Sequence, residues 1–253
     1  MPRYFIRLAY QGKNYHGWQS QQNASSVQDE LEKCLSLKLS AKIRLTGCGR
    51  TDTGVHALMY YAHADWDKEL SREELVVLTE QLNVFLPDDI VVYAIVQVAA
   101  DAHARFDAVS RSYRYIISRK KDPFLLEGSW YVYGPIDVVL LQQAAAILFE
   151  YTDFTSFSKL HSSTKTNDCK IMAASWHEAD NQLIFNITAD RFLRNMVRSI
   201  VGTMLEIGKG KMSLAEFRKV IEAKNRAAAG LSVPAKGLYL FQVAYPVEIS
   251  EAL

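Results

Sequence analysis

The segment Ile43–Ala64, IRLTGCGRTDTGVHALMYYAHA, joins two short apolar runs through a glycine-rich turn. The runs 43–45 and 58–64 are typical of strands, and three glycines between them permit left-handed φ angles and close backbone contacts. Arg50 and Asp52 stand two positions apart in this turn. A carboxylate beside an arginine can be held ionised and directed at a ligand. An aspartate in a turn also commonly bonds its own backbone, so turn chemistry alone leaves both interpretations open.

The hydrophobic pattern around this segment predicts two successive α/β halves with mainly antiparallel strands. In the first half we expect strands at 3–10, 43–45, 58–64 and 90–99, and helices at 27–39 and 72–82. In the second half we expect strands at 112–118, 171–176, 183–189 and 238–245, and helices at 138–148, 193–208 and 214–223. The predicted division makes residues 1–104 an N-terminal subdomain that carries the Asp52 loop and residues 105–253 a C-terminal subdomain.

Composition excludes several classes of protein. With 253 residues and 49% hydrophobic composition, the chain can bury a substantial core. The longest apolar run, 90–96, is far shorter than the roughly 18 residues of a membrane span, and the first residues are typical of a strand, not of a signal peptide. The three cysteines lack metal-ligand spacing and favour a reduced, cytoplasmic protein. Cofactor motifs do not occur, and His56, His63 and Asp65 lack the spacing of a zinc site, so we predict no cofactor and no metal.

Charge is distributed unevenly although the formal net charge is only +1. Residues 65–101 are mainly acidic, whereas residues 105–121 carry six basic side chains against Asp107. A basic segment can bind phosphates, but it is also compatible with an ordinary solvated face. Tyr113 and Tyr115 alternate with these basic residues, which favours RNA, although both can equally be core aromatics of a strand.

Five sequence blocks, in the same order, resemble those of the bacterial tRNA pseudouridine synthase A family. They are 49–57 (GRTDTGVHA), 10–21, 111–115, 192–202 and 228–240, and together they span nearly the whole chain. Position 53 is Thr where the family more often has Ala. The resemblance implies an α+β fold of two ferredoxin-like α/β subdomains. Their sheets would join into one mainly antiparallel sheet flanked by helices, with the active-site cleft between the subdomains.

The same resemblance implies roles for individual residues. Asp52 matches the catalytic aspartate, and Arg198 matches an arginine that pairs with it. Tyr113 matches a substrate-contacting tyrosine that lies against the uracil ring, and Arg50 matches an arginine that helps to extrude the target nucleotide.

Helical spacing indicates a second set of candidate arginines. A helix through this region would place Arg191, Arg194 and Arg198 on one face at i, i+3 and i+7. We expect the first two to face RNA phosphate. Three solvated arginines are the alternative interpretation.

The resemblance implies a homodimeric enzyme that converts uridine to pseudouridine at positions 38, 39 and 40 of the anticodon stem-loop of tRNA. The polar loop 159–169 would border the RNA. One alternative is a non-catalytic RNA-binding protein with ferredoxin-like halves, but a carboxylate such as Asp52 disfavours RNA binding unless it acts in catalysis. A hydrolase is a poorer alternative because no Gly-x-Ser-x-Gly motif is present.

Overall fold

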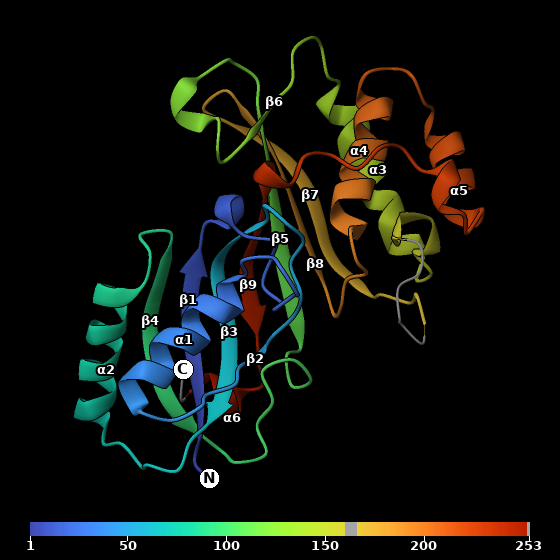
Figure 1. Cartoon of the computed structure of the whole chain (residues 1–253). Helices are drawn as coiled ribbons and strands as arrows, with labels where there is room; N and C mark the ends of the chain where they lie inside the picture. Colours follow the sequence, from blue (N-terminus) through green and yellow to red (C-terminus); the bar gives the residue numbers. More distant parts are fainter. Residues whose placement is uncertain (160–165, 252–253) are drawn as a thin grey trace. The chain divides into compact units, whose positions relative to one another are not determined.

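The computed structural model describes residues 1–159 and 166–251 (Figure 1). The chain forms two compact units, Met1–Ser110 with Leu240–Leu253, and Arg111–Tyr239. Each unit combines helices with mainly antiparallel strands, which confirms the predicted mixed α/β class. The segment from Leu240 onward thus belongs to the first unit. The ferredoxin-like topology, the joining of the two halves and a domain boundary at 104/105 stay predictions.

In the first unit, β1 runs antiparallel between β3 and β4, and the short strand β2 pairs with β3. In strand order, β9 comes next to β3. The bounds are β1 (Arg3–Tyr10), β2 (Thr46–Gly47), β3 (His56–Asp65), β4 (Ile90–Val98) and β9 (Leu238–Ala244). The strand predicted at 3–10 is confirmed, but its burial does not alternate: Tyr4, Ile6 and Leu8 are fully buried on one face. Phe5 is fully buried as well, since the ring of Tyr245 covers the opposite face.

The main helices of the first unit begin directly after a serine, close to the predicted positions 27 and 72. α1 (Val27–Leu39) and α2 (Arg72–Phe85) pack against each other, and α2 packs against β4 (Figure 1). Ser26 accepts a hydrogen bond from the backbone N–H of Asp29, and Ser71 forms a complete capping box with Glu74. Each cap satisfies a backbone donor that would otherwise lack a partner at the helix start. The helices η1 (Gly12–Asn14) and α6 (Val247–Ser250) also belong to this unit.

In the second unit, β8 runs antiparallel between β5 and β7, and β6 pairs in parallel with β5. The bounds are β5 (Ser110–Ser118), β6 (Trp130–Tyr131), β7 (Ile171–Ala179) and β8 (Gln182–Ala189). A two-residue turn joins β7 to β8. Its residues Asp180 and Asn181 have φ of +47° and +62°, the conformation of a tight hairpin turn that Asp and Asn tolerate.

The main helices of the second unit pack beside this sheet, with α3 against β7 and α4 (Figure 1). They are α3 (Val138–Ile147), α4 (Met196–Gly208) and α5 (Leu214–Glu222). Shorter 3-10 turns are η2 (Pro123–Leu125), η3 (Leu148–Glu150), η4 (Thr155–Phe157), η5 (Arg226–Ala228) and η6 (Ala235–Gly237). Across the described ranges of the chain, no helix combines the length and hydropathy that a membrane span requires.

Candidate active site

The Asp52 loop is a tight turn between β2 and β3. Val55 donates its backbone N–H to the carbonyl oxygen of Asp52 at 3.1 Å, which closes a four-residue turn. Gly54 has φ of +78°, a left-handed conformation that glycine adopts without strain. Asp52 is partly exposed, so its carboxylate can reach a ligand. The turn predicted from the glycines is therefore present, and the catalytic role of Asp52 stays a prediction.

The segment that follows β1 packs directly against this loop. A Cβ atom added to Gly12 would lie 2.0 Å from the carbonyl oxygen of Val55. One added to Gly17, which has φ of +91°, would lie 2.2 Å from the carbonyl oxygen of Thr51. Only glycine permits two backbones to approach so closely. The sequence block 10–21 is thus the physical support of the block 49–57.

Hydrogen bonds and stacked rings hold the residues that precede the aspartate. Thr51 Oγ1 accepts the backbone N–H of Trp18 at 3.1 Å and is hydrogen-bonded to the hydroxyl of Tyr10 at 2.9 Å. The ring of Tyr60 stacks on Trp18 with centroids 4.2 Å apart, and its hydroxyl donates to the carbonyl of Gly49. These aromatic side chains are buried. The carboxylate therefore projects from a backbone held in one conformation, as electrostatic catalysis requires.

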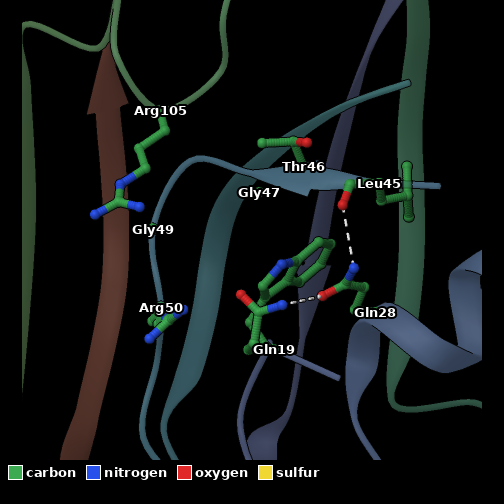
Figure 2. A pocket seen from close by; sticks show the side chains of 9 residues that line it. Gln19, Gln28, Leu45, Thr46, Gly47, Gly49, Arg50 and Arg105 are labelled. Atoms are coloured by element: carbon green, nitrogen blue, oxygen red, sulfur yellow. Dashed lines mark hydrogen bonds between the residues drawn. The ribbon is translucent and has the colours of Figure 1, made fainter. Parts of the chain in front are cut away.

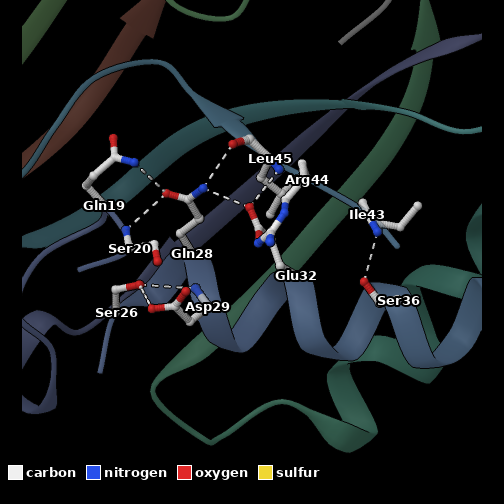
Figure 3. Close-up of polar contacts among 10 residues, drawn as sticks. All are labelled: Gln19, Ser20, Ser26, Gln28, Asp29, Glu32, Ser36, Ile43, Arg44 and Leu45. Carbon is white, nitrogen blue, oxygen red and sulfur yellow. Dashed lines mark hydrogen bonds and ion pairs between the residues drawn. The ribbon is translucent and has the colours of Figure 1, made fainter. Parts of the chain in front are cut away.

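A buried polar pair on α1 anchors the strand that leads into the loop (Figure 3). Gln28 donates from Nε2 to Glu32 Oε1 at 2.7 Å and to the carbonyl of Leu45 at 3.1 Å. Glu32 Oε1 also accepts the backbone N–H of Leu45 at 2.9 Å, and Oε2 accepts from Arg44 at 2.6 Å. Glu32 is only 5% exposed. Its carboxylate thus fixes residues 44–45, directly before β2.

The contact between Gln28 and Glu32 was not predicted, although the spacing of the two residues in the sequence indicates it. Positions 28 and 32 are one helical turn apart and lie on the same face of α1 as Leu35, which is fully buried. A glutamine and a glutamate on a buried helix face need hydrogen-bond partners. The pattern could therefore have predicted a buried polar contact, but the partner residues follow only from the fold.

The histidines beside the loop bond backbone groups. Nδ1 of His56 accepts the N–H of Gly12 at 3.1 Å, and Nδ1 of His63 accepts the N–H of Ala104 at 3.1 Å. Burial lowers the pKa of His63 to about 4, so this ring is neutral at pH 7. Within residues 1–159 and 166–251, no three His, Cys, Asp or Glu side chains form a group that could hold a metal ion. Both histidines therefore contribute to packing of the first unit.

In the second unit, β5 carries two tyrosines with different environments. Tyr115 is fully buried, its hydroxyl donates to the carbonyl of Pro234 at 2.8 Å, and burial raises its pKa. Tyr113 is partly exposed and makes an edge contact with Phe192, with ring centroids 5.0 Å apart. Tyr115 is thus the core aromatic, whereas Tyr113 is only partly buried. The substrate contact of Tyr113 stays a prediction.

Arg198 on α4 is tied to the loop that precedes β9. Its Nε donates to the carbonyl of Val233 at 2.7 Å, and the N–H of Val233 donates to the carbonyl of Arg198 at 3.2 Å. One turn further along α4, a Cβ added to Gly202 would lie 1.8 Å from the carbonyl oxygen of Leu231. By sequence alone this loop resembles a plain connector. In the structure it is docked on α4 and orients the Arg198 guanidinium.

The expected stripe of three arginines on one helix face is wrong. α4 begins at Met196, and the preceding residue Asn195 has φ of +67°. A left-handed residue cannot continue a right-handed helix, so Arg191 and Arg194 lie before the helix. Arg191 is partly exposed and donates to Thr166 Oγ1 at 3.4 Å, and Arg194 is exposed. Their contact with RNA phosphate stays a prediction, without the support of a shared helix face.

The candidate residues belong to both compact units. Asp52 and Arg50 lie in the first unit, and Tyr113 and Arg198 lie in the second. The pairing of Asp52 with Arg198 therefore stays a prediction. Part of the loop 159–169, namely residues 160–165, lies outside the described residues, and its contact with RNA also stays a prediction.

Comparison with known proteins identifies the family of this chain. The family model described as tRNA pseudouridine synthase matches residues 7–107 and 144–246, ranges that contain Asp52 and Arg198. The tRNA pseudouridine synthase A of Parabacteroides distasonis is 50% identical over 249 residues, 98% of each chain. The protein of the same name from Bacteroides thetaiotaomicron is 51% identical over 98% of this chain and 93% of the relative. That from Clostridium acetobutylicum is 39% identical over 95% of this chain and 98% of the relative. A match of this extent, with the Asp52 loop inside it, means that the chain belongs to the tRNA pseudouridine synthase family.

Proposed function

We propose that this chain converts uridine to pseudouridine in the anticodon stem-loop of tRNA, at positions 38, 39 and 40. Family membership makes the chain an isomerase. The observation that carries the proposal is the Asp52 loop. In this loop the partly exposed Asp52 lies on a turn whose backbone is in close contact with the backbones of Gly12 and Gly17. A protein that only binds RNA gains nothing from a carboxylate held in this way, because it repels phosphate.

The reaction needs little beyond this carboxylate. The bond between ribose C1′ and uracil N1 breaks, the base rotates, and C5 bonds to C1′. N1 gains a proton and C5 loses one, so atoms and electrons balance without a cofactor. Attack on uracil C6, attack on C1′ and abstraction of a ribose proton all require the same ionised carboxylate, which is the role of Asp52.

Three further residues complete the proposed site. Arg198, oriented by its bond to Val233, stabilises the Asp52 carboxylate. The ring of Tyr113 stacks on the extruded uracil, a contact worth roughly 1–3 kcal/mol per base in comparable sites. Arg50 is exposed beside Asp52 and occupies the space that the target nucleotide leaves.

The test compares the wild type with Asp52→Asn on unmodified tRNA, with pseudouridine measured position by position. We expect conversion at positions 38, 39 and 40 by the wild type, and a rate lower by about 10³-fold or more for the variant. Asp67→Asn, an exposed aspartate in the same unit, is the matched control and should convert tRNA normally. Equal RNA binding by wild type and variant, with conversion by neither, would overturn the proposal in favour of a non-catalytic RNA-binding protein. Conversion only at other uridines would overturn the assigned positions.

We also propose a homodimer that acts in the cytoplasm. A dimer would let one subunit hold the body of the tRNA while the other presents its active site. The chain has a mass of 28.6 kDa, so light scattering should give twice that value, about 57 kDa. A mass of one chain at micromolar concentration, with full activity, would contradict the dimer.

A further inference from the structure

The segment 11–19, which follows β1, contacts the Asp52 loop at several points. Its two glycines lie against the backbone of the loop, as described above. Further along the segment, Gln19 lines a cavity of about 140 Å³ together with Gly49 and Arg50 of the loop (Figure 2). A shift of this segment would therefore displace the turn that carries Asp52 and change the cavity beside it.

A hydrogen bond links Tyr15 of this segment directly to the turn. The backbone N–H of Gly54 donates to the carbonyl oxygen of Tyr15 at 3.2 Å. Gly54 follows Asp52 by two residues and has the left-handed φ that the turn requires. Tyr15 is 5% exposed, so close packing restricts its side chain. The position of Tyr15 thus determines where the backbone that carries Asp52 lies.

Asp89, in the loop between α2 and β4, binds three residues of the same segment. Its Oδ1 accepts from the hydroxyl of Tyr15 at 2.6 Å, and its Oδ2 accepts from Nδ2 of Asn14 at 2.9 Å. Its backbone carbonyl oxygen accepts the N–H of Gln11 at 2.9 Å. Burial and the bond to Asp89 raise the pKa of the Tyr15 hydroxyl, which is therefore protonated and donates at neutral pH. A hydrogen bond from a hydroxyl to a carboxylate is stronger than one between neutral groups.

The loop that carries Asp89 is itself anchored on both sides. Nδ2 of Asn83 in α2 donates to the carbonyl oxygen of Val92 in β4 at 2.8 Å, and Oδ1 of Asn83 accepts the N–H of Val92 at 2.8 Å. Directly after Asp89, Ile90 pairs with Tyr10 in the ladder between β4 and β1. Asp89 therefore projects from a rigid part of the fold, as a group that positions another must do.

We propose that Asp89 is a positioning residue for the Asp52 carboxylate and acts through Tyr15. The carboxylate of Asp89 holds the hydroxyl of Tyr15, and the carbonyl oxygen of Tyr15 holds the N–H of Gly54. All four residues belong to the first unit. The proposal rests on the proposed function, because it concerns the same carboxylate. Displacement of a reacting group by about 1 Å can lower a rate about 10²-fold, so loss of this link should slow the reaction without weakening RNA binding.

Single-turnover conversion of unmodified tRNA, with the enzyme in saturating excess, tests the proposal. This rate constant does not depend on the affinity for tRNA, and a residue that only stabilises the fold leaves it unchanged while the variant is folded. Asp89→Ala should lower it about 10–100-fold, and Tyr15→Phe about tenfold. The dissociation constant for tRNA should stay within about twofold of the wild type in both.

Three further variants separate position from charge and from stability. Asp89→Asn keeps an oxygen that can accept from Tyr15 and should convert tRNA within about fivefold of the wild-type rate. The double variant with Asp89→Ala and Tyr15→Phe should be about as slow as Asp89→Ala alone, because both changes remove the same bond. Asp88→Ala changes the exposed neighbour and is the matched control, with the wild-type rate expected.

Amide hydrogen exchange measures the same link without any reaction. In protein labelled with ¹⁵N-glycine, the N–H of Gly54 should exchange about tenfold faster in Asp89→Ala than in the wild type. Gly202 and Gly208, in α4 of the second unit, are the internal references and should exchange as in the wild type.

A lower melting temperature of Asp89→Ala, with unchanged exchange at Gly54 and an unchanged single-turnover rate, would overturn the proposal and make Asp89 a structural residue only. Weaker tRNA binding with an unchanged rate at saturation would overturn it in favour of an RNA contact. Failure of the proposed function is a separate result, since the wild type then forms no pseudouridine. The exchange at Gly54 still supports or contradicts the link from Asp89 to the turn in that case.

Discussion

Replacing Glu32 by alanine should destabilise the first unit and release the strand that leads to the Asp52 loop. The carboxylate is 5% exposed and accepts hydrogen bonds from Gln28, from the backbone N–H of Leu45 and from Arg44. Alanine leaves the first two donors buried without an acceptor. Arg44 is 69% exposed at its side chain and returns to water at little cost.

The magnitude follows from these contacts. Each buried donor left without a partner costs about 1–3 kcal/mol, so Glu32→Ala should lower the free energy of unfolding by about 3 kcal/mol. Glu32→Gln is a sharper comparison. Oε1 accepts both buried donors, whereas Oε2 accepts from the exposed Arg44. A glutamine that keeps its oxygen at the Oε1 position should therefore cost less than about 1 kcal/mol.

Urea unfolding of the wild type, Glu32→Ala and Glu32→Gln measures both values, with Glu30→Gln on the same helix as control. In thermal unfolding the alanine variant should melt about 6–12 °C lower, because a chain of this length loses about 2–4 °C per kcal/mol. A cost for Glu32→Ala below about 0.5 kcal/mol would refute the stabilising role of the two buried bonds. Equal costs for both variants would show instead that the negative charge matters rather than the position of Oε1.

Three further expectations concern the loop, the pH and the core. Gly17→Ala should cost about 2–4 kcal/mol and most of the activity, since its Cβ would lie 2.2 Å from the carbonyl oxygen of Thr51 at φ of +91°. The pKa of His63 is about 4 in the folded state and about 6.5 when unfolded, so the unfolded state binds the proton first. This contribution to stability is complete above pH 6.5 and declines as the pH falls towards 4, by about 2 kcal/mol between pH 6.5 and 5 in urea unfolding. Tyr115→Phe removes the bond to Pro234 and should cost about 1–2 kcal/mol, measured in the same way.

Each of these has a matched control. Gly134 has φ of +92° but no atom within 4 Å of an added Cβ, so Gly134→Ala isolates the cost of the backbone conformation, about 1–2 kcal/mol. His177→Gln changes an exposed histidine and should leave the loss of stability at acidic pH intact, whereas His63→Gln should remove it. Tyr131 is 37% exposed, so Tyr131→Phe should be neutral. Identical behaviour of a residue and its control would contradict the corresponding argument.

The local elements were predictable because their signals lie within a few residues of one another. Serine caps at 26 and 71 marked the starts of α1 and α2, and Asp180 with Asn181 marked the hairpin between β7 and β8. The glycines around Asp52 predicted a turn that displays a carboxylate. In each case the physical cause, a cap or a left-handed backbone, acts within one turn of the chain.

The incorrect predictions concern segments whose local sequence pattern is compatible with two different backbone conformations. Helical spacing placed Arg191 and Arg194 on one face with Arg198, but the left-handed Asn195 starts α4 only at Met196. Asparagine permits this conformation but does not require it, because its helix propensity is only moderately unfavourable. The expected strand at 43–45 is likewise replaced by β2 at Thr46–Gly47, where the chain reaches β3 and can pair.

The sequence by itself determined the class of fold, most helices and strands, the Asp52 turn and, through its ordered blocks, the family. Only the tertiary structure decided what holds the turn in place. The backbones of Gly12 and Gly17 contact the backbone of the turn, and Glu32 accepts the backbone N–H of Leu45 directly before β2. The tertiary structure also decided that the chain from Leu240 returns to the first unit. Periodicity and capping depend on near neighbours, whereas these contacts join residues far apart in sequence and exist only once the chain has folded.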